Sequence, residues 1–174
     1  MIFNTLKHKT IERSFYRKRE KLKGIKRHHK STKIAKVGVL VDATILEDTN
    51  ILSSISKHLS ISKQDIELFK YQKHDSKKQL DAKTCSSKSF GWFGSLKLNT
   101  LQEFVKKDFD LFINYGFSEN LYSNIITLQS NSNFKIGFAS EFTDLYDLSV
   151  TDSQNDIECF NAEVAKYLKI LKKL

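Results

Sequence analysis

The sequence contains no proline, although about 5% would be ordinary. Together with abundant Lys, Asn, Ile and Ser, this absence indicates the composition bias of an AT-rich genome, and we attach no function to it. Apolar runs of roughly 20 residues, the length that spans a bilayer, are also missing. Residues 1–9 lack the apolar segment of a secretory signal. The sequence therefore predicts neither a transmembrane segment nor secretion.

Cysteine is scarce as well. The two cysteines, Cys85 and Cys159, lie far apart in the sequence, and neither has a second cysteine near it. This usage is typical of free thiols in a reducing compartment, with a single disulfide as the alternative. We therefore expect a cytoplasmic protein.

Motifs of a known reaction are absent from the sequence. No glycine-rich string marks a phosphate-binding loop. The histidines do not have the spacing of metal ligands, because the adjacent His28 and His29 would point about 100° apart on a helix. His58 and His74 are isolated. We expect no metal site, no cofactor and no catalytic residue, and the sequence favours a non-enzymatic protein.

What the sequence does contain is positive charge concentrated at one end. Residues 1–36 hold thirteen of the 29 Lys and Arg residues but only two acidic ones, Glu12 and Glu20. The other 138 residues hold 16 basic and 18 acidic side chains and are nearly neutral. Self-repelling charges in one segment do not help a fold, so this segment is typical of a protein that binds an anionic partner.

Residues 1–35 are expected to form a basic helical arm, because a single glycine interrupts good helix formers between residues 5 and 30. An apolar stripe within about 80° of the helical wheel would dock the arm on the rest of the chain or on a partner. The stripe consists of Ile11, Phe15, Leu22 and Ile25. The candidate nucleic-acid-binding residues around it are Arg13, Arg17, Lys18, Arg19, Lys21, Lys23, Lys26, Arg27 and Lys30.

RNA or a ribonucleoprotein is the expected partner of this arm. Its cations would neutralise phosphates, which predicts strong salt dependence and little sequence readout. Phe15, Tyr16 and His28 could stack on unpaired bases, which favours RNA. Deletion of residues 1–33 should then abolish RNA binding and leave the rest folded. The alternative partner is an acidic protein or an anionic membrane surface, although four stripe residues without tryptophan predict weak insertion.

The rest of the chain alternates between strand-like and helix-like segments. Residues 36–41 form a short continuous apolar run, typical of a strand that is buried on both faces. Asn155 with Glu158 predicts a capping pair at the start of the last helix. The expected strands are 36–41, 66–71, 109–114, 134–138 and 145–150. The expected helices are 50–59, 101–107, 119–129 and from about 156 onward, and 72–89 is expected to be a polar loop.

This alternation predicts parallel strands with helical crossovers. We expect residues 36–174 to form one domain of the α/β class, a three-layer α/β/α Rossmann-like sandwich with a mainly parallel five-stranded sheet. Helices should cover both faces of the sheet, and the basic N-terminal helix should precede the domain. The order of the strands is not predicted.

In open parallel sheets, ligands bind beyond the carboxyl ends of the strands. Asp42 follows the first strand and could act as an acid or base, and Ser118 or Asn120 could hold a phosphate at a helix start. The alternative is that Asp42 and Ser118 are helix caps or turn residues. The function alternative to RNA binding is a small Rossmann-like enzyme, or the relic of one, that binds a nucleotide or sugar phosphate in this cleft. Its candidate residues are Asp42, Thr44, Asn114, Tyr115, Ser118 and Asn120.

The string Phe90-Gly91-Trp92-Phe93-Gly94 is the most distinctive in the chain. Its two glycines permit a tight turn that could present aromatic faces to bases or a sugar. The favoured interpretation is that the cluster plugs the edge of the core, with the glycines allowing close backbone approach.

Four strings follow one another along the chain: Phe90-Gly-Trp-Phe-Gly94, Phe109-Asp-Leu-Phe-Ile-Asn-Tyr115, Lys135-Ile-Gly-Phe138 and Tyr167-Leu-Lys-Ile-Leu171. In this order they resemble an uncharacterised family of about this length from flavobacteria-like bacteria, which implies no activity. Residues 108–138 are also similar to the N-terminal half of heptosyltransferase-like glycosyltransferases. That second resemblance implies a shared Rossmann-like half-fold only, because this chain is too short for their two-domain architecture.

Overall fold

The structure, a computed structural model, describes residues 2–23, 33–43, 50–73, 80–116, 120–139, 142–151 and 156–174. Its strands are β1 (Val37–Asp42), β2 (Ile66–Tyr71), β3 (Thr84–Cys85), β4 (Phe109–Tyr115), β5 (Ser132–Phe138) and β6 (Leu148–Val150). Its α-helices are α1 (Ile2–Leu22), α2 (Ile51–Leu59), α3 (Asn99–Lys106), α4 (Leu121–Gln129) and α5 (Ile157–Ile170).

The strands form one parallel sheet in the order β3-β2-β1-β4-β5-β6. The predicted α/β sandwich, preceded in the sequence by a basic helix, is confirmed. The sheet has six strands where five were expected. The additional strand is β3, which pairs two residues with the end of β2. It lies in the polar stretch that we expected to be a loop, and two residues are too few to show the alternation of a strand.

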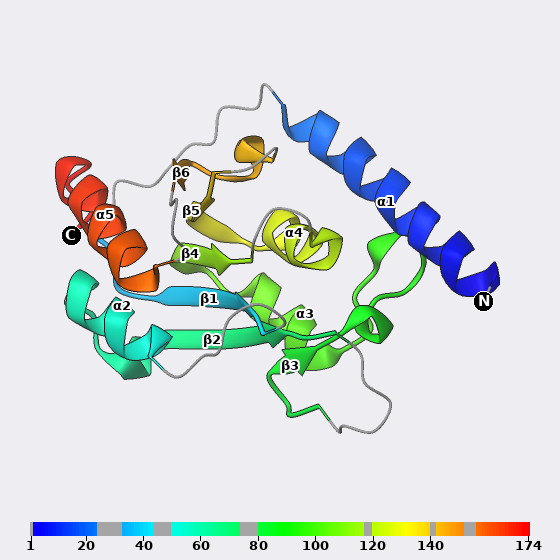
Figure 1. The fold of residues 1–174 in the computed structure, drawn as a ribbon, viewed down its shortest axis with the longest axis horizontal. Coiled ribbons are helices and arrows are strands. Elements are labelled where there is room, and N and C mark those ends of the chain that lie inside the picture. The colour runs from blue at the N-terminus through cyan, green and yellow to red at the C-terminus, as the bar shows by residue number, and fades with distance from the viewer. Residues whose placement is uncertain are drawn as a thin grey trace.

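Helices cover both faces of the sheet (Figure 1). Successive side chains of a strand point to opposite faces, so Val39 packs with α2 and α5 while Leu40 packs with α3 and α4. Four of the 20 buried residues in the first cluster are aromatic, against seven of 15 in the second. We therefore call the side under α2 and α5 the aliphatic face, and the side under α3 and α4 the aromatic face.

The basic helix α1 packs on the aromatic face. Ile11 and Phe15 are buried there, and the Phe15 ring meets the Phe142 ring edge-on at 5.5 Å. Their expected role in an apolar stripe is therefore confirmed. Leu22, the last residue of the helix, is exposed instead, and Ile25 lies outside the described residues.

Polar contacts fix α1 in the same position. The Arg19 guanidinium donates hydrogen bonds from Nε to both carboxylate oxygens of Asp144, at 2.9 and 2.7 Å, and also lies over the Phe142 ring. Because Ile11 and Phe15 belong to the core, deletion of residues 1–33 would uncover apolar surface on the body. Point substitutions are therefore the cleaner test of what α1 binds.

The N-cap of the last helix lies one residue after the expected one. Asp156, not Asn155, is the N-cap of α5, and its Oδ1 accepts hydrogen bonds from the backbone N–H groups of Glu158 and Cys159. The predicted Asn155–Glu158 capping pair is therefore wrong, because Asp156 already serves these first N–H groups.

Candidate functional site

Two of the predicted strand-end residues meet at the centre of the sheet. Asp42 ends β1 and is 1% exposed, and its Oδ2 accepts a 2.6 Å hydrogen bond from Asn120 Nδ2. The Asn120 Oδ1 accepts the N–H groups of Tyr122 and Ser123, which makes Asn120 the N-cap of α4. The pair lies between β1 and β4, where the strand order reverses direction.

The other two described candidates turn away from this pair, to opposite faces of β4. The Asn114 side chain donates to Thr127 and Tyr146 and accepts the Gly116 N–H, and it is fully buried on the aromatic face. Neighbouring side chains of a strand alternate between faces, so Tyr115 points into the aliphatic core. Both side chains hold elements together inside the protein and do not face a cleft.

The remaining strand-end candidates, Thr44 and Ser118, lie outside the described residues. The structure thus brings together Asp42 and Asn120, a carboxylate acceptor and an amide donor that hydrogen-bond to each other.

The candidate cations of α1 separate into two groups. Arg19 holds the helix on the body through Asp144, and Lys23 pairs with Glu20. The exposed cations in the second group are Arg13, Arg17, Lys18 and Lys21. Lys26, Arg27 and Lys30 lie outside the described residues.

The aromatic string at residues 90–94 has a buried part and an exposed part. Phe90 and Gly94 are buried, which matches the favoured interpretation of a plug at the edge of the core. Trp92 and Phe93 are 42% and 61% exposed, which matches the alternative of presented aromatic faces. Phe93 has φ of 59°, a left-handed conformation that costs a bulky residue about 1–2 kcal/mol. The turn therefore holds an exposed aromatic ring against its own backbone preference.

Sequence reasoning missed a groove between α1 and the turn that follows β3. Lys7, His8 and Lys9 line it from the helix, and Lys88 and Tyr122 line it from the body. The basic residues Lys7 and Lys9 could have been noted from the charge of the arm. The partners Lys88 and Tyr122 come from distant segments, and no local pattern connects them to α1.

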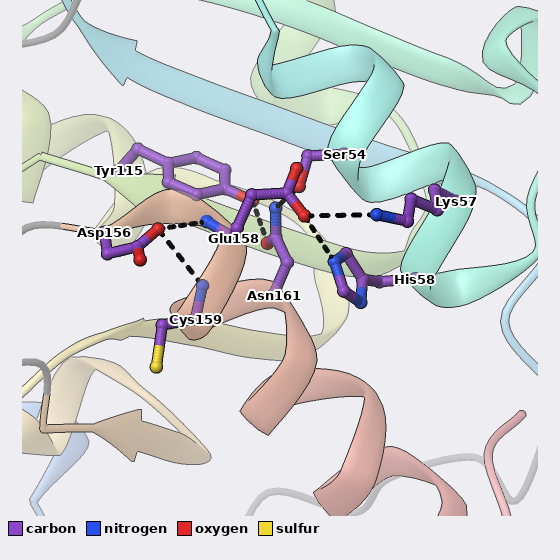
Figure 2. Close-up of polar contacts among 8 residues, drawn as sticks. All are labelled: Ser54, Lys57, His58, Tyr115, Asp156, Glu158, Cys159 and Asn161. Atoms are coloured by element: carbon purple, nitrogen blue, oxygen red, sulfur yellow. Dashed lines mark hydrogen bonds and ion pairs between the residues drawn. The ribbon is translucent and has the colours of Figure 1, made fainter.

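A second polar cluster joins α2 to α5 on the aliphatic face. Figure 2 shows Lys57 and His58 converging on the carboxylate of Glu158, at 3.6 and 2.8 Å. The hydrogen bond from His58, with a further one from Ser54, lowers the pKa of Glu158 to about 2.

The same cluster continues inward through Asn161, whose Oδ1 accepts the Tyr115 hydroxyl and whose Nδ2 donates to Ser54 Oγ (Figure 2). Ser54 is 2% exposed, so its hydroxyl has no access to a substrate. The arrangement is therefore a clasp between two helices, although it contains a serine, a histidine and a carboxylate.

The two cysteines and the possible metal ligands of the described residues were the remaining candidates for chemistry. Cys85 and Cys159 are both free; burial raises the pKa of Cys85 to about 12, which keeps its thiol protonated. No three His, Cys, Asp or Glu side chains among these residues gather at a metal-binding distance. In the same part of the chain, no helix combines the length and apolar character needed to cross a membrane.

The order of the strands defines the doubly wound, Rossmann-like class of α/β proteins. Within that class, the chain belongs to a family of unknown function, DUF6913, which matches residues 7–171 and so includes most of α1 as well as the sheet. No curated protein and no solved structure matches the chain. The predicted uncharacterised family is confirmed, whereas its flavobacterial source and the heptosyltransferase similarity stay predictions.

Proposed function

We propose that this protein is a cytoplasmic, non-enzymatic RNA-binding protein that contacts RNA or a ribonucleoprotein through the outward side of α1. The observation that carries the proposal is how α1 is held. Burial of Ile11 and Phe15 and the Arg19–Asp144 ion pair fix one side of the helix, and the opposite side keeps its cations in solvent.

The outward cations form a regular row. Arg13, Arg17 and Lys21 are four residues apart, so they share one side of the helix about 6 Å from each other along its axis. A row of fixed cations can neutralise successive phosphates without ordering a flexible arm on binding. We call these three residues the outer row.

Aromatic side chains lie beside the helix. Lys18 and the exposed Phe93 lie close together where α1 meets the Trp92–Gly94 turn. A cation next to an exposed ring suits an unpaired base, because the ring stacks on the base while the cation holds the phosphate. This placement favours single-stranded RNA over a smooth duplex.

The test measures the affinity for a labelled single-stranded RNA at several salt concentrations by fluorescence anisotropy. The variant Arg13→Ala/Arg17→Ala/Lys21→Ala should bind about tenfold more weakly or worse at low salt. Its slope of log K against log salt should fall by about two, since each lost phosphate contact on a single strand contributes about 0.7.

The matched control is Lys63→Ala/Lys166→Ala/Lys169→Ala, which removes the same charge from exposed positions away from α1. It should bind RNA as the parent protein does. Equal binding by the outer-row variant and the parent would contradict the proposal. Vesicles with and without anionic lipid provide the competing partner: outer-row-dependent binding to anionic vesicles, with no RNA binding, would assign α1 to a membrane surface instead.

A further inference from the structure

The groove between α1 and the body has the size of a small-ligand site. It encloses about 550 Å³, within the range of roughly 300–1,000 Å³ that small molecules occupy in proteins. One wall is the first half of α1, with Lys7, His8 and Lys9. The other wall combines Lys88, from the turn after β3, with Tyr122, from the first turn of α4.

The groove lies at the edge of the sheet where doubly wound proteins bind their ligands. Tyr122 is two residues after Asn120, which contacts Asp42 at the carboxyl end of β1. Its ring stacks at 5.6 Å on Tyr71, the last residue of β2. Ligands of this fold class bind outside the carboxyl ends of the strands, beside the point where strand order reverses. In this protein α1 lies beyond these strand ends (Figure 1), and its first half forms one wall of the groove.

The charge of the groove suits an anion. Three lysines and one glutamate, Glu12, line it. Within the described part of the chain, Lys7, Lys9 and Lys88 form no ion pair. Burial and the nearby Lys97 ammonium lower the pKa of Lys7. A phosphate group beside Lys7 would offset the repulsion from Lys97.

On the body side, one aromatic ring lines the groove, that of Tyr122. Besides its stacking on Tyr71, the Tyr122 ring packs at 4.9 Å against buried Phe90, and His8 of α1 meets it edge-on at 6.2 Å. Packing of this kind fixes the Tyr122 ring before any ligand arrives, so little side-chain entropy is lost on binding. The Tyr122 side chain nevertheless stays partly exposed, and aromatic rings with an accessible face are the usual partners of nucleobases.

We propose that this groove binds a nucleotide, with its phosphate at Lys7 and Lys88 and its base against Tyr122. The proposal does not rest on the outer row, since the two sets share no residue. The nucleotide has two sources, a free nucleoside monophosphate or one residue of a single-stranded RNA. The chemistry of recognition is the same for both.

The experiment titrates the whole protein with uridine 5′-monophosphate, adenosine 5′-monophosphate, inorganic phosphate and a short single-stranded RNA. Calorimetry and NMR measure the binding of each probe. The groove variant is Lys7→Glu/Lys88→Glu, and the matched control is Lys166→Glu/Lys169→Glu on α5. We expect the groove variant to weaken nucleotide binding at least about tenfold and the control to leave it unchanged. Tyr122→Leu should weaken nucleotides more than inorganic phosphate.

The pattern of affinities identifies the source. If mononucleotides bind about as tightly as RNA, the ligand is a free nucleotide. If only RNA binds, and the groove variant weakens that binding, the ligand is one residue of an RNA chain. Inorganic phosphate that binds as tightly as the nucleotides would overturn the base contact and so the proposal. Binding that the groove variant leaves unchanged, or no binding to any probe, would overturn it as well.

The same titrations separate this proposal from the RNA-binding role of α1. The outer-row variant should lose affinity for long RNA and keep its affinity for a mononucleotide. If the outer-row variant behaves like the parent while the groove variant loses nucleotide binding, the groove stands and the outer row does not.

Discussion

The two faces of the sheet are built from different side chains, and α1 packs on only one of the two. Under α2 and α5 the core is mainly aliphatic, and its polar side chains satisfy one another from Tyr115 through Asn161 and Ser54 (Figure 2). Under α3 and α4 the core is rich in aromatic rings, and α1 adds exposed cations and a groove at its edge.

This difference indicates that one face mainly stabilises the fold, while the other carries the groups that are available to a ligand. A polar group with internal partners contributes to the fold and offers little to a ligand. Cations in solvent beside exposed or accessible rings contribute little to the fold, and so they remain available for an anionic aromatic partner. The aliphatic face therefore serves as the scaffold, and we locate both proposed contacts on the aromatic face.

The largest expected effect tests whether α1 belongs to the core. Phe15→Ala should lower the free energy of unfolding by about 3–5 kcal/mol, because it empties a buried site on the aromatic face. The same substitution at Phe160, buried under α5, gives the value for the aliphatic face. Urea denaturation measures both. Phe3→Ala, at a residue that is 78% exposed, should stay within about 0.5 kcal/mol. A loss of under about 1 kcal/mol at Phe15 would show that α1 is not packed on the body in solution.

The next effect compares one buried amide side chain from each face, Asn114 and Asn161. Asn114→Ala leaves the Gly116 N–H, the Tyr146 hydroxyl and the Thr127 hydroxyl without this partner, and should cost about 2–3 kcal/mol of unfolding free energy. Asn161→Ala removes two such contacts and should cost about 1–2 kcal/mol.

Exposed Asn99→Ala, at the start of α3, is the control for both amide substitutions and should change stability by less than about 0.5 kcal/mol. Thermal and urea unfolding measure all three variants. If Asn161→Ala proves the costlier substitution, the aliphatic face depends on its buried amide more than the aromatic face does.

The smallest effect is the pH dependence of the clasp between α2 and α5. The His58 and Ser54 hydrogen bonds lower the pKa of Glu158 to about 2, below its ordinary value in the unfolded chain. At a pH above that ordinary pKa, the Glu158 carboxylate therefore stabilises the folded state. This contribution is lost as the pH falls toward 2. The stability difference between the parent and Glu158→Gln should accordingly shrink between about pH 4.5 and 2.

Glu163→Gln supplies the background effect of removing an exposed carboxylate from α5. Urea midpoints measured across this pH range give the comparison. A difference between the parent and Glu158→Gln that does not change with pH would contradict the role of the clasp.

Several residues show where sequence reasoning succeeded and where it stopped. The apolar run that became β1 and the stripe of Ile11 and Phe15 were readable because burial leaves a local period in the sequence. Asp42 and Asn120 were expected at the strand ends, and they lie there in direct contact. The two sides of β4 were also readable in principle, since alternation alone sends Asn114 and Tyr115 to opposite faces.

The sequence by itself determined the parallel α/β class and the concentration of positive charge in the first helix, because both follow from neighbouring residues. Only the tertiary structure decided which cations of α1 point outward, because that depends on where Ile11 and Phe15 dock. It also decided that Lys7 faces Lys88 and Tyr122 across one groove. Those three residues come from segments about 35 to 115 positions apart, and folding free energy, not local propensity, brings them together.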